Sequence, residues 1–314
     1  MHILRSIGYS FLCICFFVSS ASGQLIPQTE GPTSHAATLP STQPKAQVLF
    51  TILDSAGGAV SALSKDEMHV QIDGKPVEVE EIRSLANEPL LFSVVVDLSG
   101  STRPFANQQV AAASKLFLAL SRGNSQGYLI FFTDELRTSD QFVDEQTAEQ
   151  MLKQIPLESR FGSTALYDAI VHACRRQLGT KIISNKSRRA IFLFSDGEDN
   201  CSHYSLLETV KIAQSEGIPI FSIGLSSHQD SESLKERKRE FAILNALSQG
   251  TGGLAGSLDD PHDVVARLQY FLQGQNLLTF KPVALKPKKH YSLKIETSAK
   301  DVHVWAATEY VAPY

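Results

Sequence analysis

The chain has 314 residues, of which 43% are hydrophobic and 20% are charged, and its formal net charge is −4 at pH 7. This length and composition are ordinary for a globular protein with one large domain and a small one. The mildly acidic balance gives no sign of binding to nucleic acid or of attraction to an anionic membrane surface.

The N-terminus has the pattern of a secretory signal peptide. A weakly basic start that includes Arg5 is followed by a mostly apolar run, residues 7–18, and then by small residues up to Gly23. The run is too short for a comfortable transmembrane helix. We therefore predict a signal peptide at residues 1–23 and an exported protein, periplasmic or extracellular, with an uncleaved anchor as the alternative. Because no later stretch is long and apolar enough, we expect no membrane span in the mature chain.

The next two stretches differ in composition. Residues 24–45 are rich in Pro, Ser, Thr and Gly and poor in large apolar residues, so we predict a disordered linker there. Residues 46–88 show apolar side chains at every second position, beginning with Val48, Phe50 and Ile52, and contain glycine-based turn signals. This pattern predicts three or four short strands with one buried face.

Residues 89–275 alternate between apolar runs and longer helical stretches. Near-continuous apolar runs are typical of strands buried on both faces, and they occur at residues 90–96, 128–132, 190–194 and 218–225. A strand at 136–142 is expected to pair with the second run as a hairpin. Helices are expected at residues 105–120, 145–155, 165–178, 204–216, 240–248 and 261–273. The polar segment 226–239 is predicted to be a surface excursion. Alternating strands and helices predict an α/β fold with a doubly wound, mostly parallel sheet that binds ligands at the carboxyl ends of its strands.

Residues 276–314 return to a strand pattern, with strands expected at 277–280, 291–295 and 302–305. Neither this segment nor residues 46–88 offers enough strands for a stable two-sided core by itself. We therefore predict that the two segments pair into one small β-sandwich-like module, with residues 89–275 inserted between them as the large domain.

Oxygen-bearing side chains follow two of the predicted buried strands. Asp97, Ser99 and Ser101 recur at alternate positions after the first strand, Asp196 ends a later strand, and Thr164 lies at the start of a helix. They can converge on one point above the sheet edge. Two carboxylates and three hydroxyls form an all-oxygen donor set, which suits a hard divalent cation. The sequence therefore predicts an Mg²⁺ site, with Mn²⁺ or Ca²⁺ as alternatives.

The order Asp-x-Ser-x-Ser after a strand, Thr before a helix and Asp after a later strand resembles the metal-ion-dependent adhesion site of von Willebrand factor type A domains. The strings Gly-Ser-Thr-Ala-Leu-Tyr-Asp-Ala at 162–169, Ser-Asp-Gly-Glu-Asp at 195–199 and Gly-Thr-Gly-Gly at 250–253 are also similar to that family. The likeness covers roughly residues 89–273. The flanking strands resemble those of bacterial proteins that carry such a domain inside a small β-module.

The resemblance implies roles for the five residues. Ser99, Ser101 and Thr164 would contact the metal directly or through water, and Asp97 and Asp196 would often act through water. The ion would then remain able to accept a carboxylate from a protein partner. The implied function is non-catalytic, metal-dependent binding of a protein or a surface.

Two alternatives remain open. A phosphatase of the haloacid dehalogenase type also has an Asp at the end of a buried strand, but it needs a second Asp two positions later. Ser99 occupies that position here, and a serine cannot act as a general acid near neutral pH. The other alternative is a structural domain with no bound metal, because Asp and Ser also favour ordinary helix starts. The sequence contains no Gly-x-Ser-x-Gly motif, which would indicate a serine hydrolase. We therefore predict no catalytic residues.

The remaining polar residues are assigned structural roles. Asp168, Glu198 and Asp199 are predicted to be helix-face or loop charges, and the nine His residues show no metal-ligand spacing. Cys174 and Cys201 are predicted not to be bridged. Cys174 lies about 15 Å along a helix from Thr164 at 1.5 Å per residue, whereas Cys201 lies in a loop near the metal end, and a disulfide needs Cα atoms within about 7 Å.

Overall fold

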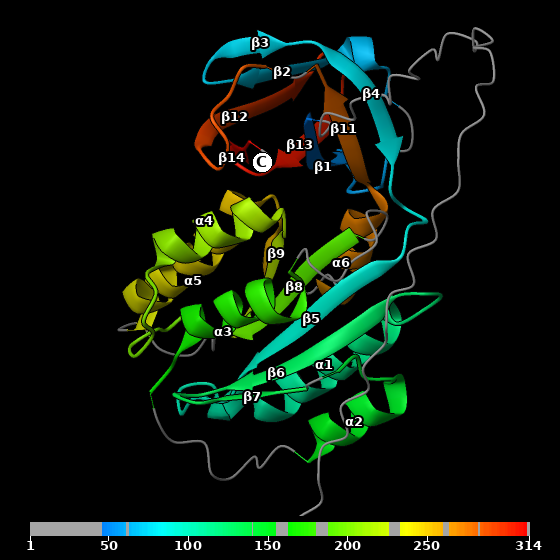
Figure 1. The fold of residues 1–314 in the computed structure, drawn as a ribbon. Coiled ribbons are helices and arrows are strands. Elements are labelled where there is room, and N and C mark those ends of the chain that lie inside the picture. The colour runs from blue at the N-terminus through cyan, green and yellow to red at the C-terminus, as the bar shows by residue number, and fades with distance from the viewer. Residues whose placement is uncertain are drawn as a thin grey trace, which may run out of the picture. The chain divides into compact units, whose positions relative to one another are not determined.

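The computed structural model describes residues 46–60, 63–139, 141–154, 163–179, 188–225, 233–259, 264–281 and 283–312. The expected signal peptide and linker, residues 1–45, lie outside this part of the chain. The described residues form one six-stranded sheet and two four-stranded sheets (Figure 1). In these ranges no helix combines the length and the apolar character needed to cross a membrane.

The six-stranded sheet is built from the apolar runs of the middle segment. Its order is β10-β9-β8-β5-β6-β7, and every neighbouring pair is parallel except β6 with β7. The doubly wound, mostly parallel sheet expected from the sequence is therefore confirmed. The strands are β5 (Leu90–Asp97), β6 (Gln126–Phe132), β7 (Leu136–Thr138), β8 (Arg188–Ser195), β9 (Ile220–Gly224) and β10 (Ala255–Ser257).

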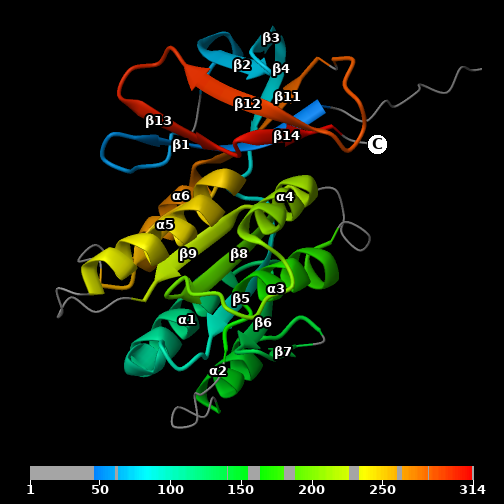
Figure 2. The ribbon, with the colours of Figure 1, turned by 90° about the vertical axis from the view of Figure 1, so that its left-hand side faces the viewer.

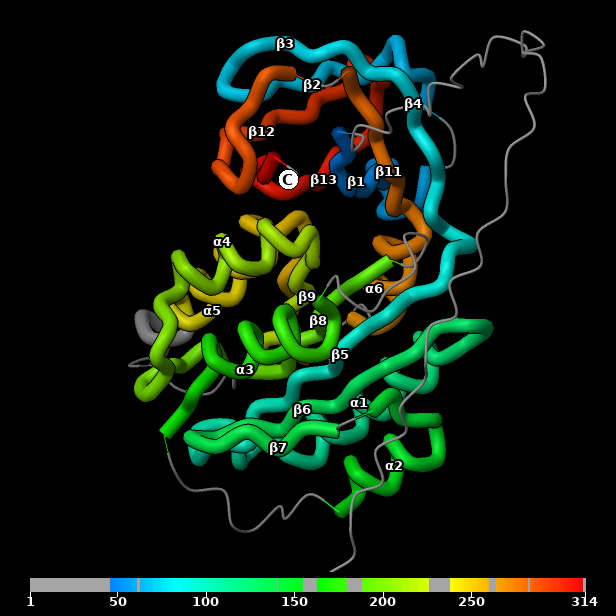
Figure 3. Tube along the Cα trace, in the orientation of Figure 1, coloured from blue at the N-terminus to red at the C-terminus, as the bar shows by residue number. Residues whose placement is uncertain are grey.

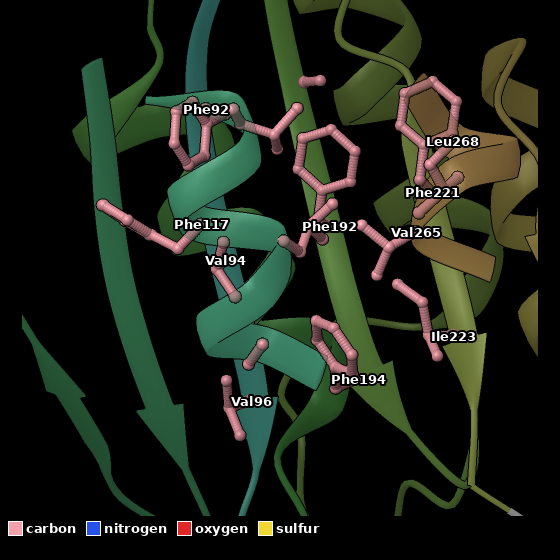
Figure 4. Close-up of a cluster of buried hydrophobic side chains, with 14 of the residues drawn as sticks. Phe92, Val94, Val96, Phe117, Phe192, Phe194, Phe221, Ile223, Val265 and Leu268 are labelled. Atoms are coloured by element: carbon pink, nitrogen blue, oxygen red, sulfur yellow. The ribbon is translucent and has the colours of Figure 1, made fainter. Parts of the chain in front are cut away.

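Helices cover both faces of this sheet. The helices are α1 (Ala106–Leu120), α2 (Glu145–Lys153), α3 (Leu166–His172), α4 (Leu206–Glu216), α5 (Ser233–Thr251) and α6 (Val264–Gln273). One cluster of buried side chains joins the sheet to α1, α2 and α6, and a second joins it to α3, α4 and α5. Figure 2 shows these helices around the sheet. Successive residues of β5 belong to different clusters. Phe92 and Val94 lie in the first cluster (Figure 4), whereas Val95 lies in the second.

The two small sheets each combine strands from both flanks of the middle segment, in the orders β13-β1-β11-β4 and β14-β12-β2-β3. Phe50 pairs with Asn276 on one side and with Ala306 on the other, and Ile72 pairs with Leu293. The predicted pairing of the flanks is therefore confirmed. The strands are β1 (Ala46–Asp54), β2 (Met68–Ile72), β3 (Lys75–Val77), β4 (Val79–Ser84), β11 (Gln275–Phe280), β12 (His290–Thr297), β13 (Val302–Ala306) and β14 (Glu309–Val311).

Two connections join the β-module to the large sheet: β4 leads into β5, and α6 leads into β11 (Figure 3). Arg188 holds these connections together. Its guanidinium donates to the backbone oxygen of Glu88 at 3.2 Å, to that of Leu272 at 2.7 Å and to the side-chain oxygen of Gln275 at 3.1 Å. The start and the end of the inserted segment are therefore tied at one place.

The start of helix α5 differs from its prediction. Helix α5 begins at Ser233 rather than at residue 240, so residues 233–239, predicted as part of a surface excursion, belong to the helix. The residues after Ser233 are mostly Leu, Lys, Glu and Arg, which are good helix formers. They lack the apolar periodicity by which an amphipathic helix is recognised, and the helix therefore cannot be seen from pattern alone.

Candidate metal centre

The turn after β5 gathers three of the five predicted ligands. Asp97 is the last residue of β5 and is fully buried, and its Oδ1 accepts a hydrogen bond from the Ser99 N–H at 2.9 Å. The hydroxyl oxygens of Ser99 and Ser101 lie 3.2 Å apart. Ser99 is buried and Ser101 is exposed, so this oxygen set extends from the end of the strand to the protein surface.

Buried polar side chains hold this turn in place. The Thr102 hydroxyl lies 3.1 Å from the backbone oxygen of Asp97 and 3.0 Å from that of Ser99. From helix α1, the Gln109 amide donates to the backbone oxygens of Asp97 at 2.8 Å and Phe194 at 3.4 Å. Gln109 therefore connects the ends of β5 and β8. These contacts to backbone oxygens set the shape of the turn without using the Ser99 and Ser101 hydroxyls.

The end of β8 brings the second carboxylate to the same place. The Ser195 hydroxyl donates to Asp97 Oδ2 at 2.6 Å and accepts from the Gly197 N–H at 3.0 Å. Asp196 lies between these two residues and is buried, and its Oδ1 accepts from the Glu198 N–H at 3.0 Å. Gly197 has φ +96°, and a Cβ there would lie 2.7 Å from the backbone oxygen of Glu240. Glycine is therefore required at this turn.

Thr164 reaches this edge of the sheet from a third segment. The Leu98 N–H donates to the backbone oxygen of Phe132 at 2.8 Å, and the Ala165 N–H donates to that of Thr133, also at 2.8 Å. Two consecutive residues at the end of β6 thus bind the Asp97 turn and the segment that holds Thr164. Thr164 is itself buried. All five predicted residues therefore lie at the carboxyl edge of the sheet, and their assignment as ligands stays a prediction.

The electrostatics of this edge favour a cation. Burial, and secondly the negative charge of Asp196, raise the pKa of Asp97 to about 7, although hydrogen bonds from Ser195 and Ser99 oppose the shift. A divalent ion near both carboxylates would relieve their repulsion and offset the loss of hydration. Among the described residues, no three His, Cys, Asp or Glu side chains gather as a potential metal site. The predicted donor set is of another kind, with two carboxylates completed by hydroxyls.

The side chains of the nearby acidic residues Asp168 and Asp199 form hydrogen bonds within the protein. Asp168 accepts from the backbone N–H groups of His203 and Tyr204 at 2.8 and 3.2 Å, and its Oδ2 lies 2.7 Å from His203 Nδ1. This hydrogen bond raises the pKa of the exposed His203. Asp199 accepts from the Ser202 hydroxyl and from the Tyr167 N–H. Both carboxylates fasten the loop after β8 to the start of α3, in agreement with their predicted loop roles.

The supporting residues that were not predicted from the sequence include Gln109, Ser195 and Asn200. Asn200 accepts a hydrogen bond from the Thr164 N–H at 2.7 Å. A signal existed only for Ser195, which directly precedes Asp196 at the end of an apolar run. Gln109 and Asn200 act on residues far from them in the sequence, and no local pattern indicates such contacts.

The thiols of Cys174 and Cys201 differ in accessibility. Cys174 is buried in a π-helical turn, Ala173–Gln177, whereas Cys201 is exposed. Burial raises the pKa of the Cys174 thiol to about 12, and only the thiolate is reactive. We expect iodoacetamide to label Cys201 and spare Cys174 in the native protein at mildly alkaline pH, and to label both after denaturation. Peptide mass spectrometry measures this, and a disulfide between the two would contradict the prediction that they are free.

Comparison with known proteins identifies the domain. A family model described as the von Willebrand factor type A domain matches residues 93–240. Comparison with curated proteins gives no match. Among solved structures, an aerotolerance-related membrane protein from Bacteroides fragilis NCTC 9343 is 20% identical, with a TM-score of 0.45, over 58% of this chain and 98% of that chain. BatB from Bacteroides thetaiotaomicron is 19% identical, with a TM-score of 0.44, over 57% and 95% of the two chains.

A third similar structure is proximal thread matrix protein 1 from the mussel byssus, with a zinc-occupied MIDAS motif. It is 16% identical, with a TM-score of 0.47, over 64% of this chain and 49% of that chain. With TM-scores below 0.5, these three structures add nothing to what the family match and the sheet order establish. The matched residues 93–240 include the end of β5, all of β6, β8 and β9, and all five predicted site residues. The chain therefore carries a von Willebrand factor type A domain.

Proposed function

We propose that this protein is a non-catalytic binding protein whose domain holds a divalent metal through Asp97, Ser99, Ser101, Thr164 and Asp196 and binds a partner protein or surface through that metal. Von Willebrand factor type A domains are typically non-catalytic adhesion or interaction domains. The observation that carries the proposal is the buried carboxylate of Asp97, which lies at the carboxyl edge of the sheet beside Asp196, with hydroxyl groups within reach. Such a carboxylate is costly to bury unless an opposite charge compensates it.

The carboxylates and the hydroxyls of the proposed site have different roles. Asp97 and Asp196 supply two negative charges, and the neutral hydroxyls of Ser99, Ser101 and Thr164 add oxygen ligands without further charge. Both Asp97 oxygens already accept hydrogen bonds from the protein, which suits an indirect role through water. When bound, the cation would supply an open position for a carboxylate of the partner. Oxygen ligands of this kind favour Mg²⁺, with Mn²⁺ and Ca²⁺ as alternatives.

A titration of the purified protein with Mg²⁺, Mn²⁺ and Ca²⁺ tests the proposal. We expect at least one ion to bind in the millimolar range or more tightly and to raise the melting temperature. Because the folded state alone binds the ion, saturation at 100 times Kd should add about 2.7 kcal/mol to the free energy of unfolding. Calorimetry and thermal denaturation measure this.

Two outcomes would favour the alternatives. Turnover of p-nitrophenyl phosphate that depends on Asp97 would favour a haloacid dehalogenase-type phosphatase. An unchanged melting temperature with all three ions would favour a structural domain without a bound metal.

The remaining parts of the chain complete the proposal. We propose that residues 46–88 and 276–314 form a β-module that carries the domain, residues 89–275, and that residues 1–23 and 24–45 are a signal peptide and a linker. The protein would then act after export, in the periplasm or outside the cell. Detection of mature protein that begins at residue 24, by N-terminal sequencing of secreted material, supports this part of the proposal.

A further inference from the structure

We infer that Asn200 is a positioning residue for the proposed metal centre, because it holds Thr164 by both of its backbone polar groups; this inference rests on the proposed function. The Asn200 side-chain oxygen accepts from the Thr164 N–H at 2.7 Å. The Asn200 N–H donates to the Thr164 backbone oxygen at 3.0 Å, and the Cys201 N–H donates to the same oxygen at 3.3 Å. The loop after β8 thus forms hydrogen bonds to both the backbone N–H and the backbone oxygen of Thr164.

Thr164 needs these hydrogen bonds from the loop because it lies outside helix α3. The helix begins at Leu166, and Ala165 at its N-cap makes no side-chain capping hydrogen bond. Thr164 is nevertheless buried, so its N–H needs a partner from elsewhere. Asn200 supplies that partner, and it does so with a side chain, which a substitution can remove without altering the backbone contacts.

The loop that carries Asn200 is fastened independently of the Asn200 side chain. Ser202 binds Asp199, and the backbone N–H groups of His203 and Tyr204 bind Asp168. Removing the Asn200 side chain should therefore leave the loop in place and deprive only the Thr164 N–H of its hydrogen-bond acceptor.

The position of Asn200 also couples two proposed ligands. Asp196 begins the same loop, and Glu198 closes a tight turn there by donating its N–H to Asp196 Oδ1. Four residues after Asp196, Asn200 reaches across to Thr164. A single short segment, residues 196–200, therefore sets the place of the carboxylate from β8 relative to the hydroxyl that precedes α3. Groups that orient metal ligands in this way commonly change metal affinity when they are replaced.

Two substitutions in the full-length protein test the inference. Asn200→Ala removes the acceptor, whereas Asn200→Asp keeps an oxygen at the same position. We expect Asn200→Ala to raise the Kd for Mg²⁺ or Mn²⁺ by about 10-fold or more, as loss of such supporting contacts commonly does. Asn200→Asp should bind at least as tightly as the wild type. His203→Ala is the matched control, since it lies in the same loop and makes no hydrogen bond to Thr164, and it should bind the metal like the wild type.

Amide hydrogen exchange in the metal-free protein supplies a second readout. The Thr164 N–H should exchange about 10-fold faster or more in Asn200→Ala, where it has lost its partly buried hydrogen bond to the side chain, and at the wild-type rate in Asn200→Asp. The Ala165 N–H, which binds the Thr133 backbone oxygen, should be unchanged in all variants and serves as an internal control.

The outcomes separate this inference from the proposed function. Equal Thr164 exchange in Asn200→Ala and the wild type, or wild-type metal affinity in Asn200→Ala, would overturn the inference. If the wild type itself bound no metal, the proposed function would fail, while faster Thr164 exchange confined to Asn200→Ala would still show that Asn200 positions Thr164.

Discussion

Replacing Asp97 by Asn is expected to abolish the metal-dependent rise in melting temperature while leaving the metal-free protein folded. The amide has the shape of the carboxylate but lacks its charge, and it can still accept from the Ser99 N–H and bond to the Ser195 hydroxyl. At saturating metal the lost stabilisation is about 2.7 kcal/mol. For a domain of this size each kcal/mol shifts the melting temperature by roughly 2–4 °C. Thermal denaturation with and without metal measures the loss, and Asp196→Asn should behave in the same way.

Glu198→Gln is the matched control for both variants. It removes the same charge two residues from Asp196, but the Glu198 side chain is exposed and only its backbone N–H contacts Asp196. We expect this variant to keep the full metal-dependent shift. If Asp97→Asn and Asp196→Asn kept it as well, the ligand assignment would be wrong.

Ending the chain after Gly274 is expected to make the protein aggregate. Strand β1 lies between β11 and β13, and β2 pairs with β12, so the truncation removes three of the strands that cover the first flank. Phe50 and Val70, each 1% exposed, would face water. Burial of one such side chain contributes roughly 1.5–3 kcal/mol, and the exposed strand edges would be free to pair with other chains. Light scattering and dye binding to exposed apolar surface measure the effect.

A milder truncation after Thr308 is the control. It removes β14, which pairs with β12 at the edge of its sheet, and keeps β11, β12 and β13. This protein should stay soluble with reduced stability, partly because the contact of Tyr310 with Phe280 is lost. A soluble protein that ends at Gly274 and retains the strand content of residues 46–84 would show that the first flank folds without the second.

The large sheet is the part of the fold that can be predicted best. Strands buried on both faces must be apolar throughout, so residues 90–96 and 190–194 stand out as β5 and β8. Helix α5 is harder, because its first turns have the propensity for a helix but no apolar face. Strand β14 was not predicted, since three residues are too few to show alternation.

The candidate site divides in the same way. Asp97, Ser99 and Ser101 are grouped by the sequence itself. Asp196 follows from a predicted strand end, and Thr164 follows from a predicted helix start. The supporting contacts do not follow from any local pattern. Gln109 reaches the backbone of Phe194 across 85 residues, and Asn200 reaches Thr164 across 36. Such pairs are set by how the helices and loops pack on the sheet, which a single sequence does not display.

The pairing of β5 has a mechanical consequence for a domain that holds on to a partner. This strand follows the connection from the β-module at one end and carries Asp97 at the other, and it pairs along its length with β6 from Leu91 to Asp97 and with β8 from Leu90 to Val96. Tension between a partner at the metal and the β-module would therefore run lengthwise through β5. Both rows of hydrogen bonds would then be loaded together in shear rather than broken one by one. The strand that bears the proposed ligand is therefore also the strand best placed to resist this force.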